Sequence, residues 1–196
     1  RKAKQILEDI VGKPVIGYRA PSFTIMEETK WALQILVEEG YRYDSSIFPI
    51  VHDRYGMPGA QPWCHTLTTS SGTIWEVPPT TVKLAGIRIP VAGGGYFRLF
   101  PYWLSHSLLK RAAADGHPLV MYLHPWELDT EQPRMRGTLV ARFRHYLNLE
   151  QTEPRLTQLL NDFPFAPICE TLMPIKELCR EYQVFHSKQV AVGGVS

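Results

Sequence analysis

The sequence predicts an α/β protein built around a parallel sheet, and two observations support this. Short apolar runs of strand length alternate with helical patterns, which is the βαβ order of parallel sheets with right-handed crossovers. Each of three runs also ends in a polar residue, namely Arg19, Asp44 and His124. Because βα folds place their chemistry at the carboxyl ends of strands, we expect these three side chains to meet around one pocket.

Length and composition limit the classes of protein that fit. The 196 residues suit one domain and are too few for a complete (β/α)8 barrel, which usually needs ~250. With 44% hydrophobic and 20% charged residues, the composition is that of a globular protein. The net charge of +2 and the scattered Lys and Arg residues argue against nucleic acid or an anionic membrane as a partner. No apolar run approaches the ~18 residues of a membrane span.

The chain opens inside a helical pattern, without an initiator Met or the apolar core of a signal peptide, which predicts a piece of a longer protein. Cys64, Cys169 and Cys179 are odd in number and lack C-x2-C spacing, which favours reduced thiols over disulfides. The compartment stays open on these grounds, with the cytoplasm favoured over the periplasm.

Hydrophobic periodicity and capping residues predict the elements of the first half. Gly12 should end the first helix, and Thr24 with Glu27 should form a capping box at the start of the second. An irregular segment over 47–66 is long enough to be a lid or a binding wall. In order, we expect a helix over 3–11, a strand over 14–18, a helix over about 24–40, a strand over 41–44 and an irregular segment over 47–66.

The second half is predicted in the same way, with Gly93–Gly95 as a flexible turn that allows a close backbone approach. This turn lacks the spacing of a nucleotide-binding loop. We expect one or two strands over 74–84 broken at the prolines, a helix over 101–116, a buried strand over 120–124, a loop over 133–137, a helix over 152–163, a strand over 166–169, a helix over 171–182 and a loose tail over 186–196.

Each of the three strand-end residues also has a purely structural interpretation. Arg19 can hold a carboxylate with two parallel hydrogen bonds, or it can be a surface residue in a proline-stiffened turn. Asp44 can serve chemistry or cap a turn. His124 can be a catalytic residue at the rim of the sheet or a hydrogen-bonded structural histidine. In either case Pro125 should end its strand.

Four separated motifs resemble those of the polysaccharide deacetylases, the NodB-homology group of carbohydrate esterases. They are Arg19-Ala20-Pro21-Ser22, Tyr43-Asp44-Ser45-Ser46, Trp75-Glu76-Val77-Pro78 and Leu123-His124-Pro125-Trp126-Glu127, and the resemblance extends from residue 1 to about Cys169. The sequence is most similar to the branch found with bacterial exosortase and exopolysaccharide systems, in which Gly-Gly-Gly-Tyr-Phe-Arg, here residues 93–98, also occurs.

The resemblance implies a distorted seven-stranded (β/α) barrel that hydrolyses the N-acetyl group of amino sugars in a polysaccharide. It also implies a divalent metal, usually zinc, held by an Asp and two His, with a further Asp as the general base. The chain has neither a Thr-Phe/Tyr-Asp-Asp-Gly segment nor a His-x3-His pair. We therefore expect an incomplete barrel without its first strands, no metal ligand in this chain, and no metal-dependent turnover by the chain alone. The expected boundaries are 1–183 for the carboxyl-terminal part of the catalytic domain with a helical extension, and 184–196 for a flexible tail.

The resemblance assigns roles residue by residue. His124 matches the catalytic acid, Leu123 lines the pocket for the acetyl methyl group, and Arg19 orients the missing base. Pro21 presents the backbone N–H of Ser22 to the oxyanion, although the family usually has an aromatic residue at Ser22. Asp44 is the candidate for the family's later Asp, and Trp75 or Trp126 for its aromatic wall.

The residues themselves fit amide hydrolysis, which needs an acid to protonate the departing amine. A histidine, which titrates near ~6.5, suits this role when a carboxylate accompanies it. Asp44, Glu76 and Glu127 are the candidates for that carboxylate. For sugar contacts, Trp75, Trp126, Tyr96 and Phe97 offer flat faces, or they serve ordinary packing.

Two other functions remain open from the sequence. The chain can belong to a barrel hydrolase of small linear or cyclic amides, which ureide or imide turnover would reveal. It can also be a carbohydrate-binding relative without catalysis, in which case the upstream segment would lack the metal ligands. The oligomeric state is open, a homo-oligomer included.

Overall fold

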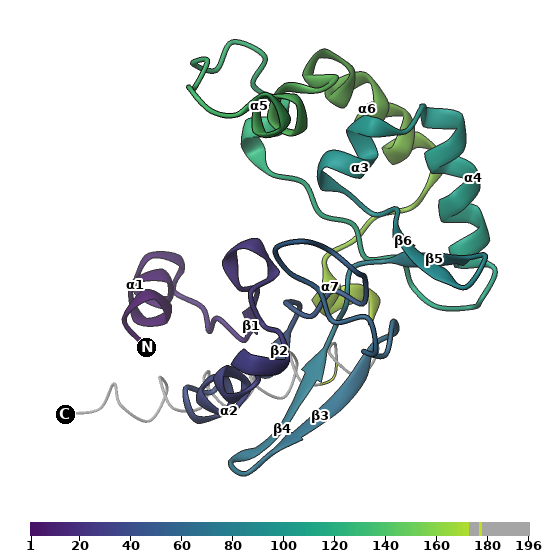
Figure 1. The fold of residues 1–196 in the computed structure, drawn as a ribbon. Helices are drawn as coiled ribbons and strands as arrows, with labels where there is room; N and C mark the ends of the chain where they lie inside the picture. The colour runs from purple at the N-terminus through teal and green to yellow at the C-terminus, as the bar shows by residue number, and fades with distance from the viewer. Residues whose placement is uncertain (173–176, 178–196) are drawn as a thin grey trace. The chain divides into compact units, whose positions relative to one another are not determined.

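The computed structural model describes residues 1–172 and 177, and its contacts group into two compact units, each with its own core (Figure 1). Unit 1 comprises Arg1–Phe48, His52–Pro78 and the described part of Ala166–Ser196. Unit 2 comprises Pro49–Val51 and Pro79–Phe165. The two units are described separately below.

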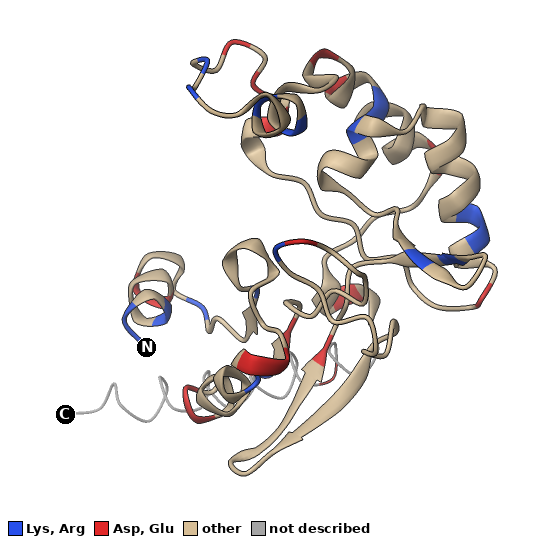
Figure 2. Cartoon of the chain, viewed as in Figure 1, with Lys and Arg blue, Asp and Glu red and all other residues tan. Residues whose placement is uncertain are grey.

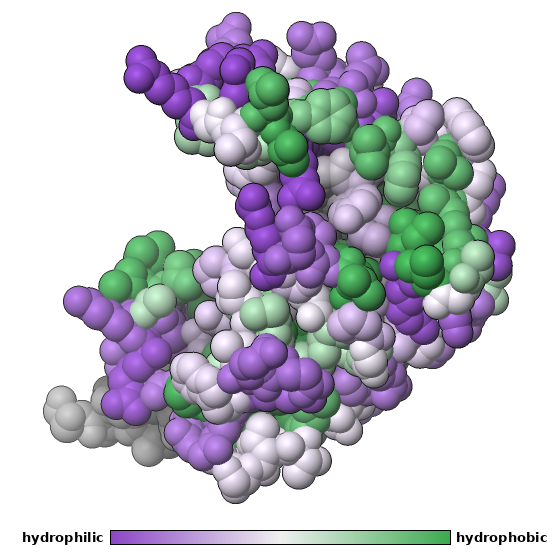
Figure 3. All heavy atoms as spheres, viewed as in Figure 1, coloured by the Kyte–Doolittle hydropathy of each residue, from purple (hydrophilic) through white to green (hydrophobic). Residues whose placement is uncertain are grey.

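Unit 1 begins with helix α1 (Lys2–Val11), which confirms the first predicted helix. Gly12 ends it in the left-handed region, at φ 61°, and its N–H donates to Glu8 O at 2.9 Å. The apolar stripe that predicted the helix is largely exposed, as the green spheres over α1 show (Figure 3). Ile6, Leu7, Ile10 and Val11 are each about half exposed or more.

The sheet of unit 1 has the strand order β1-β2-β4-β3. The strands β1 (Gly17–Tyr18), β2 (Tyr43–Asp44) and β4 (Gly72–Glu76) are parallel, whereas β3 (His65–Thr69) pairs with β4 in the antiparallel sense. Helix α2 (Trp31–Glu38) connects β1 to β2, which confirms the predicted βαβ order (Figure 1). Leu33, Leu36 and Ile74 pack together in its core.

The predicted capping box of Thr24 and Glu27 is wrong. Thr29 Oγ1 instead accepts a hydrogen bond from Met26 N at 2.8 Å and donates one to Thr24 O at 2.7 Å. This hydroxyl stabilises a short 3₁₀ turn, η2 (Glu27–Thr29), before α2 begins. A hydroxyl two residues inside the turn therefore replaces the one expected at its start, and the α-helix is half as long as predicted.

Unit 2 combines a β-hairpin with helices. The hairpin consists of β5 (Thr81–Leu84) and β6 (Ile87–Pro90). Since β4 precedes Pro78-Pro79 and β5 follows it, the predicted strands on each side of this break are confirmed. Phe97, Leu109 and Leu159 form the centre of its core. The helices and turns are α3 (Gly94–Leu99), α4 (Tyr102–Ala113), η3 (Pro125–Leu128), α5 (Leu139–Tyr146), η4 (Leu149–Gln151) and α6 (Thr152–Asp162). Both α4 and α6 were predicted, and α5 was not.

The segment 119–124 is extended but is not the buried strand that the sequence predicted. Val120 O accepts from Thr80 N at 3.1 Å, Tyr122 N donates to Ala92 O at 2.9 Å, and a single parallel bridge joins Tyr122 to Gly93. The segment 119–124 pairs with the loop before β5 and the loop after β6, and both loops are too short to continue the hydrogen bonding as a β-ladder. The side chains of residues 119–123 are half-buried.

Gly93 and Gly94 belong to a helix start rather than to the predicted flexible turn. Gly94 is the first residue of α3, and Gly93 precedes it at φ 135°. The predicted close backbone approach is confirmed, because a Cβ on Gly93 would lie 1.9 Å from Tyr122 O. Only glycine fits a position with this φ and this contact.

The predicted strand at 166–169 is also wrong, because Pro167 caps the short helix α7 (Ile168–Thr171). The predicted helix over 171–182 lies almost entirely outside the described residues, as does the predicted tail.

The fold is mixed α/β, with parallel and antiparallel strands in one four-stranded and one two-stranded sheet. Within residues 1–172 these sheets do not close into a barrel. No helix in the described part of the chain is long and apolar enough to span a bilayer.

Candidate functional site

The carboxyl edge of the unit 1 sheet gathers three candidate polar residues. Tyr18, Asp44 and Glu76 are register partners on the parallel strands β1, β2 and β4, so Arg19 follows one residue beyond the same row. Figure 2 shows the acidic segments of this sheet in red. The expectation that strand ends carry the polar residues is thus met for Arg19 and Asp44, and Glu76 joins them.

Two serines connect these strand ends. Arg19 Nε donates to Ser45 O at 2.9 Å, and Ser45 Oγ donates to Val77 O at 2.5 Å. Ser46 Oγ accepts from Ala20 N at 2.7 Å and donates to Asp44 Oδ1 at 2.6 Å. The dipeptide after β2 therefore binds the segments that follow β1 and β4.

Asp44 and Glu76 form a buried carboxyl pair, and both are 0% exposed. Burial raises the pKa of Asp44, and hydrogen bonds from Glu76 and Ser46 oppose this. Burial also raises the pKa of Glu76, and the neighbouring Asp44 charge raises it further. Glu76 Oε1 accepts from Ile47 N at 3.1 Å, while Oε2 has no donor among the described residues. Both effects favour a protonated Glu76 beside Asp44 in the folded protein.

The turn after Arg19 has an unusual backbone. Ser22 and Phe23 both lie in the left-handed region, at φ 57° and 53°. Such positions cost roughly 1–3 kcal/mol each for residues other than glycine, so other contacts must maintain them. The Phe23 ring packs 5.0 Å from the Phe48 ring, and the Arg19 guanidinium lies 5.7 Å from the centre of Phe23. The turn leaves Pro21 and Ser22 exposed at the surface.

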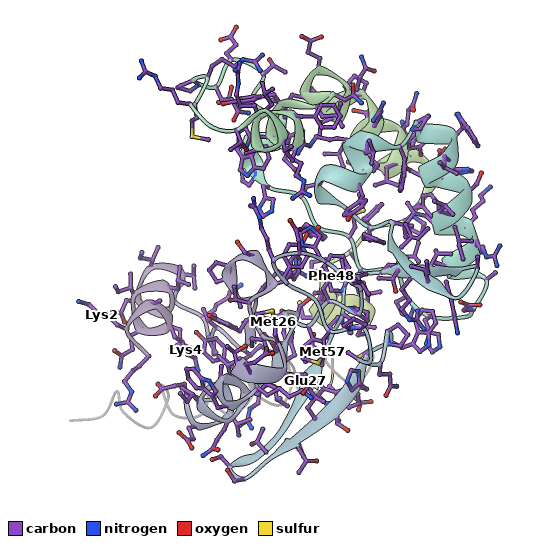
Figure 4. The ribbon with its side chains drawn as sticks, in the orientation of Figure 1. Lys2, Lys4, Met26, Glu27, Phe48 and Met57 are labelled. Atoms are coloured by element: carbon purple, nitrogen blue, oxygen red, sulfur yellow. The ribbon has the colours of Figure 1, made fainter. Side chains whose placement is uncertain are left out.

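The irregular segment between β2 and β3 forms one wall of a surface groove of about 630 Å3. Residues 26–28 form the other wall, opposite residues 52–59, and Figure 4 labels Met26, Glu27 and Met57 there. None of the candidate residues from the sequence lines this groove. Trp75 lies within β4 and is half-buried.

In unit 2, the candidate acid His124 has an exposed side chain and an anchored backbone. Its N–H donates to Glu127 Oε2 at 3.1 Å, and its carbonyl accepts from Glu127 N at 2.9 Å. Pro125 begins the short helix η3 directly after it. The tight turn therefore fixes the main chain of His124 on both sides.

Glu127 is in turn held by Arg98, a residue that the sequence analysis quoted within a motif but did not select. Arg98 Nε lies 3.2 Å from Glu127 Oε1, and the two side chains are 2% and 1% exposed. The remaining nitrogens of Arg98 donate to His145 O at 2.9 Å, Leu147 O at 2.8 Å and Arg144 O at 3.2 Å. The pair is thus a buried, fully bonded ion pair.

Aromatic stacking covers part of the Trp126 ring. His145 lies parallel to it at 4.3 Å, His124 lies nearly parallel at 5.8 Å, and Arg98 sits 5.2 Å from its centre. Burial lowers the pKa of His145, and the nearby Arg98 charge adds to this. Trp126 thus offers a sugar less free ring surface than the sequence suggested.

The other aromatic and apolar candidates of unit 2 differ in exposure. Phe97 is 0% exposed and belongs to the core, so it offers no face for a sugar. Tyr96 is half-buried on α3, with its ring 6.3 Å from Phe100. Leu123 is half-buried and packs against the core of this unit.

The structure thus builds two sets of candidates, one in each unit. The unit 1 set is Arg19, Pro21, Ser22, Asp44 and Trp75, and the unit 2 set is Leu123, His124, Trp126, Glu127 and Tyr96. Among the described residues, no three His, Cys, Asp or Glu side chains come together in a way that would hold a metal ion. Sequence reasoning missed Arg98, Ser45 and Ser46 as connecting residues. No signal in the sequence pointed to Arg98, because helix α3 was not predicted.

These features define a mixed α/β protein with polar residues at the ends of its parallel strands and an anchored, exposed histidine. Residues 45–173 match the family model described as Domain of unknown function (DUF3473), and the chain belongs to this family. No curated protein and no solved structure matches the chain.

Proposed function

We propose that the protein takes part in the hydrolysis of N-acetyl groups on amino sugars of a polysaccharide, with this chain supplying the catalytic acid. The observation that carries the proposal is the combination of an exposed imidazole and an anchored backbone at His124. Its imidazole is exposed while its backbone is bonded to a buried carboxylate. An acid needs this combination, because it must reach solvent-borne substrate from a fixed position.

The chemistry assigned to His124 is proton donation. A base takes a proton from water as the water oxygen bonds to the acetyl carbon, the carbon–nitrogen bond breaks, and the amine nitrogen takes a proton from the His124 imidazolium as it leaves. The four motifs that resemble polysaccharide deacetylases support this assignment. In unit 1, Arg19 and the Ser22 turn have the roles that the resemblance implies, orientation of a base and stabilisation of an oxyanion.

The residues described here do not fit a metal site, since no suitable cluster of ligands forms among them. In this proposal the zinc ligands belong to a part of the enzyme other than residues 1–172. We also propose that the complete enzyme has the distorted barrel of the deacetylases.

The test uses the protein produced from its complete gene. We expect release of acetate from N-acetylglucosamine oligomers, with no turnover of ureides or imides. His124→Ala should abolish this release while the metal content measured by mass spectrometry stays unchanged. His106→Ala is the matched control, because His106 pairs with Asp162 on the surface of α4 and α6, at 3.7 Å. Equal turnover in wild type and His124→Ala would remove His124 from the mechanism, and turnover of ureides alone would favour the small-amide hydrolases.

A further inference from the structure

The buried pair of Arg98 and Glu127 joins two sequence motifs that lie 29 residues apart. Arg98 ends the Gly-Gly-Gly-Tyr-Phe-Arg stretch, and Glu127 ends the His-Pro-Trp-Glu stretch. Both side chains are almost completely removed from solvent. Burying two charges costs several kcal/mol each, so the pair adds little to stability compared with an apolar pair of the same shape. A role other than stability is therefore worth seeking.

Glu127 uses its two oxygens on different partners. Oε1 faces Arg98 Nε at 3.2 Å, and Oε2 accepts the N–H of His124 at 3.1 Å. Rotation of the carboxylate would break both bonds at once. The guanidinium thus fixes the orientation of the carboxylate, and the carboxylate fixes the backbone of His124.

Arg98 is itself immobilised from several sides. Its Nη1 and Nη2 bond the three carbonyls at the end of α5 and just after it, at 2.8 to 3.2 Å. Asn148 Nδ2 and Arg155 Nη1 donate to the carbonyl of Arg98, at 2.8 and 2.6 Å. Asn148 and Arg155 thus hold only the backbone of Arg98, whereas its guanidinium is held by the three carbonyls and connects through Glu127 to the main chain of His124.

We infer that Arg98 and Glu127 are positioning residues that hold His124 in the orientation needed for proton transfer. The inference rests on the proposed role of His124 as the acid. It deepens that role by naming the residues that set its geometry. Small displacements of a catalytic group reduce the rate strongly, whereas substrate affinity depends on contacts made elsewhere. Loss of either residue should therefore lower kcat much more than it changes KM.

The first experiment compares Glu127→Leu, which removes both acceptors, with Glu127→Gln, which keeps one acceptor for the His124 N–H. We expect kcat to fall by about 100-fold in Glu127→Leu and by about 10-fold in Glu127→Gln, with KM within about threefold of wild type. Hydrogen exchange followed by NMR should show faster exchange of the His124 amide in Glu127→Leu, with partial protection restored in Glu127→Gln. This second readout does not depend on activity.

Arg155→Met is the matched control for a merely structural role. Arg155 donates to Phe97 O and Arg98 O but makes no bond to Glu127. Its loss should lower the melting temperature while kcat and the exchange of the His124 amide stay close to wild type. Equal losses of kcat in Arg155→Met and Glu127→Leu would overturn the inference. So would a wild-type kcat in Glu127→Leu while His124→Ala is inactive. Turnover that persists in His124→Ala would instead overturn the proposed function.

Discussion

Asp44 and Glu76 are register partners on the adjacent parallel strands β2 and β4, and both carboxyl groups are completely buried. Two carboxylates this close cannot both be charged without a large electrostatic penalty. The pair must therefore hold at least one proton in the folded protein. Its protonation links the stability of unit 1 to pH.

Glu76→Gln should change the pH dependence of stability. The pKa of Glu76 is raised in the folded protein by burial and by Asp44, so folding favours the protonated form. The stabilisation is fully present below the unfolded pKa, about 4.3, and is lost as the pH rises through the folded pKa. Glutamine mimics the protonated acid, so the variant should lose less stability than wild type between pH 5 and 9. Urea unfolding across this range measures the difference, and parallel curves for the two proteins would contradict the assignment of the proton.

Cys64 should react slowly with alkylating reagents. Burial raises the pKa of its thiol to about 11. Only the thiolate reacts, so at pH 8 we expect alkylation by iodoacetamide about 100-fold slower than in the urea-unfolded chain. Mass spectrometry of the peptide that contains Cys64 gives the rate. Equal rates in folded and unfolded protein would show that the thiol is not shielded.

Gly93→Ala should strongly destabilise unit 2. The new Cβ would meet Tyr122 O at 1.9 Å, and φ is 135°. Overpacking costs roughly 1–3 kcal/mol and a strained backbone roughly as much again, so we expect a loss of about 3 kcal/mol or more. Gly137→Ala is the control, because its Cβ would lie 3.9 Å from Ala141 at an ordinary φ. Thermal unfolding should place the control near wild type, and a similarly small effect of Gly93→Ala would refute the close approach.

Arg98 and Glu127 should show strong energetic coupling. Arg98→Met leaves a buried carboxylate without its cation, and Glu127→Leu leaves the reverse, so each should cost about 3–5 kcal/mol. The double variant leaves neither charge and should lose clearly less than the sum. Denaturant unfolding of all four proteins completes the cycle. Additive losses would mean that the two side chains do not interact in solution.

The sequence predicted the helices with clear caps and the βαβ order of unit 1, because hydrophobic spacing and glycine caps are local signals. The start of α2 was predicted wrongly, because the Thr24 hydroxyl donates to Pro21 O and the Thr29 hydroxyl accepts from Met26 N instead. The run 119–124 has strand composition, but whether it pairs depends on the neighbours that the fold supplies, here two short loops.

The candidate site follows the same division. Strand-end positions identified Arg19 and Asp44, because the carboxyl ends of parallel strands meet at one edge of the sheet. His124 was selected as the end of a strand that the structure does not form. Arg98 escaped selection because its partner lies 29 residues away and both charges are buried. Sequence alone assigns a buried charge to the surface by default.

The two serines after β2 have a mechanical consequence. Ser45 Oγ donates to Val77 O after β4, and Ser45 O accepts from Arg19 Nε. Ser46 Oγ accepts from Ala20 N. These hydrogen bonds connect the carboxyl ends of the three strands β1, β2 and β4 into one rigid unit. A displacement of the turn that contains Ser22 would reach the Asp44 carboxyl through a single hydroxyl, that of Ser46.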